Sequence, residues 1–432
     1  MIKIHNNSYC HTFEYLYLFV MVIYMAQMTP ETGRMVGTLS GNPIPFLIPI
    51  VLTIILLIRN PISFFHRKLW LFVGLMLIWS VAVCKKFHDF SSNNLSYYFF
   101  LFYAIFIAFI HVRVFGHSLF PIYEHIMVVF SVISLCLWGI SILFPEFDGI
   151  FRLFPETRNG NNVLYLFHWT DPAKSQVYHD FFVRNQGCSW EPGRFAVMLI
   201  PAIYANLSRE GVKFHKNKKV IILLLALAST FSTTGYSIVI LLYFIFWLTG
   251  FNGKTIFTFL FIALPLSVYI YSLDFMGEKI QDKADFEGLT NKRMANFDYH
   301  ARKDDDEYVG SLDRFESAFF EWANFQKEPL LGYGRNWNHS WFRQEITENY
   351  VLSGGLVKIL SQYGIFVGIF LYIILFFSSL RISRTCRHQK RFALAIMLIL
   401  ASISYPIFSI PIFTAFWLYG LFCDKEKTYR IG

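Results

Sequence analysis

Two arginines and a glutamate stand close together in a glycine-containing segment that runs directly into an apolar stretch. The segment reads Arg184-Asn-Gln-Gly-Cys-Ser-Trp-Glu191-Pro-Gly-Arg194. Arginine binds phosphate through two parallel hydrogen bonds and stays protonated, and glycine lets a ligand approach the backbone closely. Arg184, Arg194 and Glu191 are therefore candidates for binding an anionic ligand and moving a proton. The alternative is an interfacial anchor in which the arginines face lipid phosphate.

A second segment combines an arginine on a predicted helix with a glycine-rich turn and a histidine. Residues 311–328 have a helical apolar period, which places Arg314 on a short amphipathic helix lying at the membrane surface. The chain continues as Pro329-Leu-Leu-Gly332-Tyr-Gly334-Arg335-Asn-Trp-Asn-His339. Arg335 adds a further cation, and His339 can act as a general base, although a histidine is more often structural.

Other kinds of site find little support in the sequence. None of the 13 histidines stands in a metal-binding motif, and there is no Walker, GxGxxG or GxSxG motif. The run Asp304-Asp305-Asp306 formally satisfies D-x-D, but it lies among mixed charges and is expected to be a solvated loop. The six cysteines are scattered singly, which excludes a disulfide framework. We therefore expect neither a metal nor another cofactor.

The elements that position these groups are expected to be membrane helices. The 432-residue chain is 55% hydrophobic and 16% charged, whereas soluble domains carry roughly 25% charged residues. Apolar runs close to the roughly 20 residues needed to cross a bilayer recur along it. The composition predicts an all-α polytopic membrane protein and excludes soluble, coiled-coil and nucleic-acid-binding classes.

Twelve apolar cores are expected to span the membrane. They cover residues 13–28, 44–58, 69–84, 95–112, 121–144, 195–207, 220–231, 236–249, 255–273, 354–378, 392–404 and 407–422. The run 220–248 is split at Ser232-Thr233-Thr234-Gly235, because the basic clusters in 209–219 and 381–391 should lie on the same side. The stretch 392–423 is split at Tyr405-Pro406 because it is long for one crossing.

The distribution of Lys and Arg predicts the orientation. The segments that carry most of them are assigned to the cytoplasm, together with both termini. Residues 1–432 then form a single integral membrane domain with two long loops on the outer face, 145–194 and 274–352. Loops of this length between membrane helices are usually functional, so the chemistry is expected there.

The order of these motifs resembles the O-antigen polymerase and O-antigen ligase superfamily over roughly residues 120 to 380. The pattern is R-x-x-G-x-x-x-E-P-G, the turn Ser232-Thr233-Thr234-Gly235, an arginine upstream of P-L-L-G-Y-G, and Gly364-Ile-Phe-Val-Gly368 in a helix. The resemblance implies a GT-C-like membrane glycosyltransferase in the bacterial inner membrane. Such an enzyme uses a polyprenyl-diphosphate-linked glycan as donor at the outer face.

Carried over by motif, Arg184 and Glu191 come from the first loop, and Arg314 precedes the turn at Gly332 and Gly334 in the second. Ligase members often have an arginine in the outer turn, where this chain has Thr234-Gly235-Tyr236, and a histidine near the position of Ser353. Both differences favour a polymerase that joins lipid-linked repeat units into O-antigen, capsule or exopolysaccharide.

In this interpretation the arginines stabilise the departing diphosphate and an acidic or imidazole side chain accepts the proton of the acceptor hydroxyl. The groups expected to bind diphosphate and substrate are Arg184, Arg194, Arg314, Arg335, Gly332 and Gly334. Glu191 is the first candidate for the base and His339 the second. Direct displacement without a metal is the simplest scheme.

Two alternatives remain open. One is an O-antigen ligase that transfers finished polymer to the lipid A core. The other is a flippase or transporter of lipid-linked glycans, which would place basic residues within the spans, where we find only Lys358 and expect it to reach the interface. The expected partners are the polyprenyl-diphosphate-linked oligosaccharide and membrane lipid, with a flippase and a chain-length regulator, and no nucleic acid.

Overall fold

The computed structural model describes the chain in separate segments. These cover residues 8–25, 44–144, 162–164, 167–169, 183–189, 191–212, 217–247, 310–311, 314–346, 350–352, 355–386, 390–404 and 406–423. The predicted span 255–273, the D-x-D run at 304–306 and much of both long loops lie outside the described residues.

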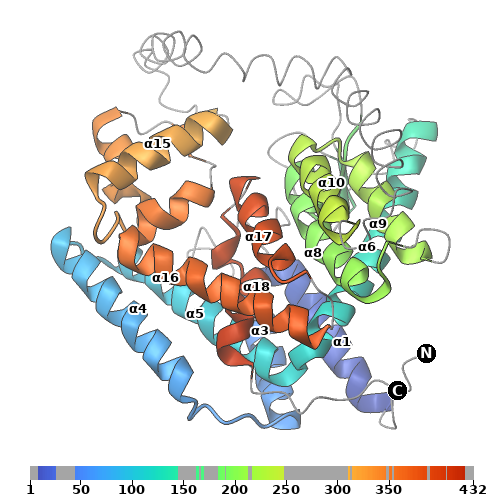
Figure 1. Ribbon diagram of the computed structural model, residues 1–432, viewed down its shortest axis with the longest axis horizontal. Helices are drawn as coiled ribbons and strands as arrows, with labels where there is room; N and C mark the ends of the chain where they lie inside the picture. The colour runs from blue at the N-terminus through green and yellow to red at the C-terminus, as the bar shows by residue number, and fades with distance from the viewer. Residues whose placement is uncertain are drawn as a thin grey trace.

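The described residues are almost entirely α-helical, which confirms the all-α prediction (Figure 1). The helices are α1 (Ser8–Met25), α3 (Ile44–Arg59), α4 (Arg67–Lys86), α5 (Ser92–Phe115), α6 (Leu119–Leu143), α8 (Pro192–Glu210), α9 (Lys218–Ser229), α10 (Thr233–Trp247), α15 (Arg314–Lys327), α16 (Leu356–Thr385), α17 (Ala393–Ser404) and α18 (Pro411–Phe422). Short strands add two small sheets, β1 (Asn162–Leu164), β2 (Phe167–Trp169) and β3 (Asn185–Gly187) in one and β4 (Gly310–Ser311) with β5 (Tyr350–Val351) in the other.

Each predicted apolar core within the described residues coincides with a helix. The two disputed runs are both divided: α9 ends at Ser229 before α10 begins at Thr233, and α17 ends at Ser404 before α18 begins at Pro411. Phe231, in the first of these breaks, has a positive φ of 48°, which ends the helical path. Pro411 stands in the first turn of α18, where its missing N–H costs no hydrogen bond.

Among the described residues, three helical stretches are long and apolar enough to cross a membrane. They are Arg67–Lys86, Ser92–Leu143, which joins α5 to α6, and Val357–Thr385. Shorter apolar helices lie at Thr12–Ile23, Ile48–Arg59, Thr233–Trp247, Ala393–Ile403 and Pro411–Phe422. These features indicate a multi-pass membrane protein.

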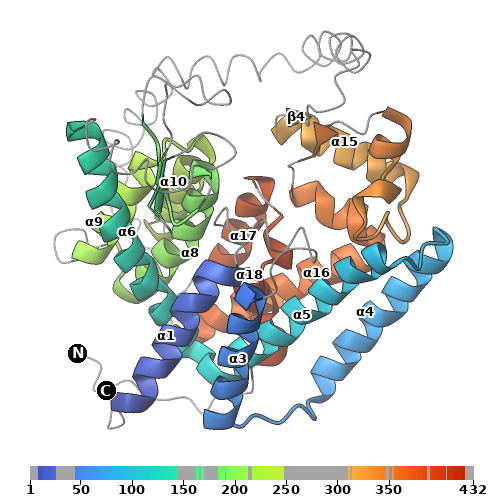
Figure 2. The ribbon, with the colours of Figure 1, turned by 180° about the vertical axis from the view of Figure 1, so that it is seen from behind.

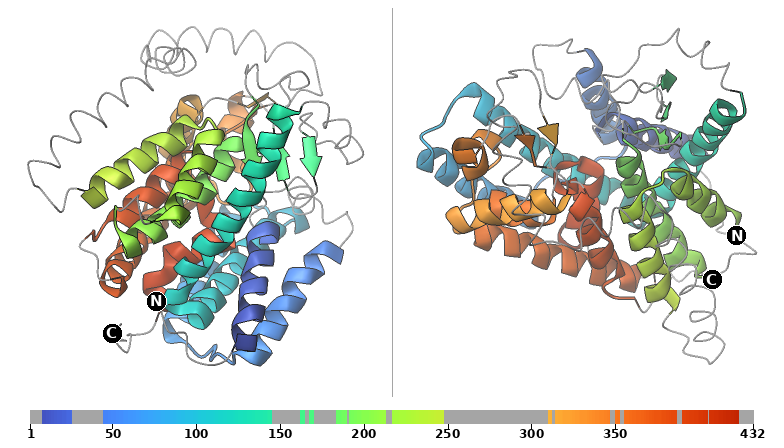
Figure 3. Two further views of the ribbon diagram at one scale, coloured as in Figure 1. Left: turned by 90° about the vertical axis from the view of Figure 1, so that its right-hand side faces the viewer. Right: turned by 90° about the horizontal axis from the view of Figure 1, so that it is seen from above.

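The core is centred on α18, whose residues are buried along nearly its whole length. Phe416 of α18 stacks on Phe120 of α6 with 4.8 Å between ring centroids. The indole Nε1 of Trp417 donates to the carbonyl of Leu371 in α16 at 2.8 Å. Seen from both sides in Figures 1 and 2, α17 and α18 lie between a group formed by α4, α5, α15 and α16 and a group formed by α6, α8, α9 and α10. The view from above in Figure 3 shows the same division.

Candidate functional site

The helix α16 is interrupted where the segment after α15 crosses it. Gly364 has φ 70° and ψ 176°, which is not helical. The N–H groups of Tyr333 and Gly334 donate to the carbonyls of Ser361 and Gln362 at 2.9 and 3.0 Å. The crossing segment therefore gives hydrogen-bond partners to carbonyls at the break. Two motifs that are separate in the sequence, P-L-L-G-Y-G and the helix glycine, thus form a single junction.

Glycine is required at this junction for steric reasons. Gly332 and Gly364 have φ values of 71° and 70°, in the region that favours glycine. A Cβ on Gly364 would overlap the backbone oxygen of Leu330, and one on Gly332 would overlap that of Gln362. Backbone atoms cannot move aside as side chains can. The structure thus gives Gly332 a packing role in addition to the proposed role in substrate binding.

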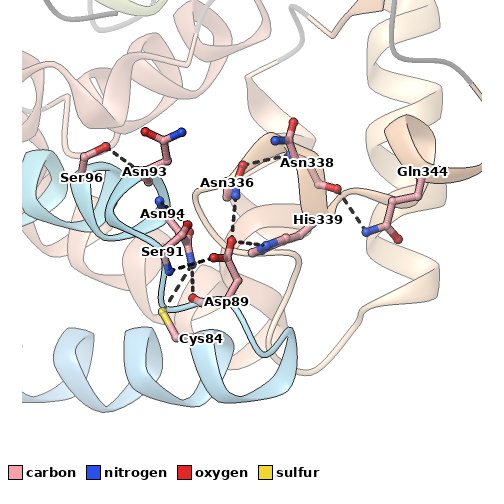
Figure 4. Close-up of polar contacts among 10 residues, drawn as sticks. All are labelled: Cys84, Asp89, Ser91, Asn93, Asn94, Ser96, Asn336, Asn338, His339 and Gln344. Carbon is pink, nitrogen blue, oxygen red and sulfur yellow. Dashed lines mark hydrogen bonds and ion pairs between the residues drawn. The ribbon is translucent and has the colours of Figure 1, made fainter. Parts of the chain in front are cut away.

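His339 is paired with Asp89, a residue that the sequence analysis did not select. Asp89 lies in the short connection between α4 and α5, and His339 ends a 3₁₀ turn over Trp337–His339; their side chains point toward one another in Figure 4. The imidazole Nε2 lies 2.8 Å from Oδ2 of Asp89. Asn336 donates to the same oxygen at 3.1 Å. Phe87 stacks on the imidazole with ring centroids 4.5 Å apart, so the ring is held in one orientation.

The surroundings of this pair define the state of each group. Hydrogen bonds from Ser91, and in smaller part from Asn336 and His339, hold the pKa of Asp89 below its ordinary value, so the carboxylate is ionised at neutral pH. An ionised carboxylate can only accept a hydrogen bond, so Nε2 of His339 is the donor in this pair. The other nitrogen, Nδ1 of His339, is buried and has no hydrogen-bond partner among the described residues. Nδ1 is therefore the ring nitrogen that Asp89 does not engage.

Arg335 lies on the same segment, four positions before His339. Its Nη1 donates to Oε1 of Gln362 at 3.3 Å and to the hydroxyl of Tyr363 at 3.5 Å. Its Nε is buried without a hydrogen-bond partner, and no carboxylate of the described residues pairs with it. A half-buried guanidinium with only neutral partners can bind an anionic ligand.

A buried ion pair joins α15 to α16 beneath this segment. The carboxylate of Glu321 is fully buried, 3.6 Å from Nζ of Lys358. Ser361 donates to it at 2.5 Å, and the hydroxyl of Tyr333 lies 3.4 Å away. Burial raises the pKa of Glu321, and the Lys358 ammonium opposes this shift. Lys358 was expected to extend its ammonium outward to the membrane surface, but its side chain is directed to Glu321 inside the protein and is only 14% exposed.

Arg184 is engaged in a different way. Its side chain is buried, and Nε and Nη2 donate to the carbonyls of Thr230 and Phe231 at 3.0 and 3.1 Å. These carbonyls belong to the turn between α9 and α10. The following residue, Asn185, begins β3 and donates to Ser134 and Ser229 at 3.2 and 2.9 Å. Arg184 thus ties the end of the first long loop to the predicted outer turn.

Glu191 and Arg194 form a pair at the start of α8. Glu191 is the N-cap residue, but its side chain makes no capping hydrogen bond. Its Oε2 lies 3.4 Å from Nε of Arg194, and the two side chains are 30% and 13% exposed. The first candidate for the base is therefore already paired with a cation.

The predicted site residues fall into two groups. We call Arg184, Glu191, Arg194 and residues 230–232 the Arg184 cluster, and Asp89, Glu321, Arg335, His339 and Lys358 the His339 cluster. The helix α17 contacts α15 on one side and α8 and α10 on the other, so it lies between the clusters (Figures 1 and 2). Arg314 is the first residue of α15, and its side chain lies outside the description.

No protein-family model matches this chain, and no curated protein is significantly similar to it. Its function must therefore be inferred from the two clusters themselves and from the order of the motifs.

Proposed function

We propose that this protein is an integral membrane glycosyltransferase that polymerises polyprenyl-diphosphate-linked oligosaccharide repeat units. The observation that carries the proposal is the pairing of His339 with Asp89. His339 stands on the same short segment as Arg335. The reaction needs a general base for the acceptor hydroxyl and a cation for the departing diphosphate. The His339 cluster offers one of each.

In the proposed reaction the acceptor hydroxyl oxygen attacks the anomeric carbon of the donor. The bond between that carbon and the diphosphate oxygen breaks, and the diphosphate leaves with the electron pair. Nδ1 of His339 accepts the hydroxyl proton, and the Asp89 carboxylate stabilises the imidazolium that forms. Arg335 stabilises the negative charge on the departing diphosphate, which is a stable anion and needs no proton.

The geometry favours His339 over Glu191 as the base. Among the described residues, Nδ1 of His339 has no hydrogen-bond partner, whereas Glu191 lies beside Arg194. We propose that Glu191 and Arg194 bind the glycan. Arg184 has a structural role in this proposal, because it holds the turn between α9 and α10. Arg314 remains a proposed diphosphate ligand on the evidence of its motif.

The proposed topology has twelve spans, cytoplasmic termini and periplasmic loops at 145–194 and 274–352 in the bacterial inner membrane. Polar contacts between distant segments support this topology. Each contact joins the ends of two predicted spans that are assigned to the same side of the membrane. These contacts are Arg59 with Glu14 and Arg209 with Glu124 on the inner side, and Arg184 with Thr230 and His339 with Asp89 on the outer side.

Transfer by the purified protein in vesicles, supplied with lipid-linked repeat units, tests the proposal. Replacing His339 by glutamine should lower the rate of polymer formation by on the order of 10² to 10⁴, the usual contribution of a general base. The matched control is His117→Gln, because His117 is exposed in the short 3₁₀ turn between α5 and α6. Wild-type transfer by His339→Gln would exclude His339 as the base.

A gel of surface polysaccharide from a deletion strain separates the polymerase from its closest alternative. Loss of a polymerase leaves single repeat units on the acceptor. Loss of a ligase leaves full-length polymer on its lipid carrier instead, which would contradict the proposal.

A further inference from the structure

The helix α15 buries polar side chains and exposes aromatic ones. Ser317, Glu321 and Asn324 face inward and are at most 1% exposed. Phe319 and Trp322 face outward and are 41% and 46% exposed. A helix that packs on a protein and faces water has the opposite arrangement. The exposed aromatic face therefore requires a partner other than water.

The inward face is held by specific contacts, so the helix cannot rotate to hide its aromatic residues. Glu321 is bound to Lys358 and Ser361 of α16, as described above. Oδ1 of Asn324 accepts a hydrogen bond from the backbone N–H of Phe342 at 2.9 Å. Phe320 lies between these polar residues and packs on Phe342, with ring centroids 4.5 Å apart. Contacts of Phe320, Glu321 and Asn324 thus fix the orientation of α15.

The exposed face of α15 is continued by an apolar stripe on α16. Leu330, three positions after α15, is 61% exposed, and its backbone packs against Gly364 at the break. Phe366 follows Gly364 and is 72% exposed. The stripe continues at helical spacing through Ile369, Ile373 and Phe377. The helix α16 is long and apolar enough to cross a membrane, and an exposed apolar stripe on such a helix is suited to contact lipid chains.

Basic side chains accompany the aromatic face. Lys85 and Lys86 are exposed at the end of α4, and Lys86 is paired with Glu328, the residue after α15. Lys327 is exposed at the end of α15 itself. Aromatic residues with neighbouring lysines are the usual composition of a surface at the boundary between lipid chains and phosphate headgroups.

We propose that α15 lies in the outer interfacial layer of the membrane and binds phospholipid. Phe319 and Trp322 insert among the upper parts of the lipid chains, and Lys85 and Lys327 contact lipid phosphate. This inference rests on the contacts of α15 and α16 and does not depend on the proposed glycosyl transfer. Because Glu321 lies on α15, the inference also places the His339 cluster at the level of the lipid phosphates.

Photocrosslinking from the aromatic face tests the inference. The photoreactive amino acid benzoylphenylalanine replaces Trp322 or Phe319 in the full-length protein, reconstituted in vesicles of phosphatidylethanolamine and phosphatidylglycerol. These replacements keep an aromatic ring at each position, so the helix should retain its packing. The matched control is the same replacement at Gln344, an exposed polar residue in the same outer segment. Mass spectrometry after irradiation identifies what each position contacts.

We expect phospholipid adducts at positions 319 and 322 to exceed those at position 344 several-fold. A crosslinked dimer as the main product at 319 and 322 would assign this face to a second copy of the chain and overturn the inference. Equal lipid labelling at all three positions, or none, would overturn it as well. Thermal unfolding of each variant in detergent confirms that the comparison is made on folded protein.

Discussion

The Arg184 cluster and the His339 cluster each place an arginine where a long loop meets the helices, but the two arginines have different partners. Arg184 donates to two backbone carbonyls at 3.0 and 3.1 Å. Among the described residues, the side chain of Arg335 donates to the neutral oxygens of Gln362 and Tyr363, at 3.3 and 3.5 Å. An arginine that satisfies backbone carbonyls contributes to the fold, whereas one without an anionic partner can bind a ligand. Motifs that look equivalent in sequence thus carry arginines with different expected roles.

The largest expected effect comes from adding a methyl group at the glycine of each region. In Gly364→Ala the new Cβ overlaps the backbone of Leu330 at a positive φ, so a loss of stability of about 3 kcal/mol or more is expected. In Gly235→Ala it meets the Cβ of Ala196 and Cδ1 of Leu227, each at 2.9 Å, and these side chains can shift. We expect a loss of about 1 kcal/mol there. Thermal unfolding in detergent measures both, and equal losses would contradict the distinction.

Breaking the buried ion pair of the His339 cluster should have an effect of similar size. Lys358→Met leaves the carboxylate of Glu321 buried without its cation, which costs about 3–5 kcal/mol. The double variant with Glu321→Gln removes both charges and should recover most of this loss. Unfolding of the two single variants and the double variant provides the measurement. A double variant as unstable as Lys358→Met would show that the two charges are not coupled.

Arg335→Ala should reduce activity more than stability. If Arg335 binds the diphosphate, turnover should fall by on the order of 10², and Arg335→Lys should restore it only in part because lysine cannot form the bidentate contact. The thermal unfolding midpoint should change little, since its protein contacts are long and neutral. The assay is polymer formation in vesicles. Full activity in Arg335→Ala would remove it from the site.

Arg184→Ala should show the reverse pattern. The carbonyls of Thr230 and Phe231 would lose their donors, at a cost of about 1–3 kcal/mol in stability. Once corrected for the amount of folded protein, the remaining activity should be close to that of the wild type. A loss of turnover in a fully folded variant would instead place Arg184 among the residues that bind substrate.

The smallest expected effect concerns the stability contributed by Asp89 as a function of pH. Its pKa is lower in the folded protein than its ordinary value, which is about 3.9. Its ionised form therefore stabilises the fold above about pH 4, and this contribution is lost as the pH falls through the folded pKa. Asp89→Asn should be less stable than the wild type at neutral pH, and the difference should shrink under acid conditions. A difference independent of pH would contradict this linkage.

The helices could be predicted largely from the sequence because apolar runs and their breaks reflect local physics. The division at 230–232 illustrates this: the run is uniformly apolar on both sides, and only the Ser-Thr-Thr-Gly turn and the balance of basic clusters indicated a break. The orientation of α15 could not be predicted in the same way. Its helical period was recognised, but the inward burial of Glu321 depends on Lys358, which is distant in the chain.

The site was only half predictable for the same reason. His339 and Arg335 stand in a motif with glycines and could be selected from the sequence. Asp89 stands alone in a short connection between two apolar helices, and nothing near it in sequence indicates its partner. The sequence shows only that Asp89 is a carboxylate near the outer end of a predicted span. The pairing itself is a property of the folded chain.

The separation between Asp89 and His339 also affects biosynthesis. The two residues lie 250 positions apart, and Trp79 donates to the carbonyl of Leu331 across 252 positions. At the usual rate of translation, roughly 10 to 50 s pass between the synthesis of the two halves of this pair. A chain interrupted after α10 would hold the whole Arg184 cluster but lack His339 and its neighbours. Only a ribosome that has passed His339 can therefore release a chain with both halves of the pair, so copies terminated before that residue should lack the proposed activity.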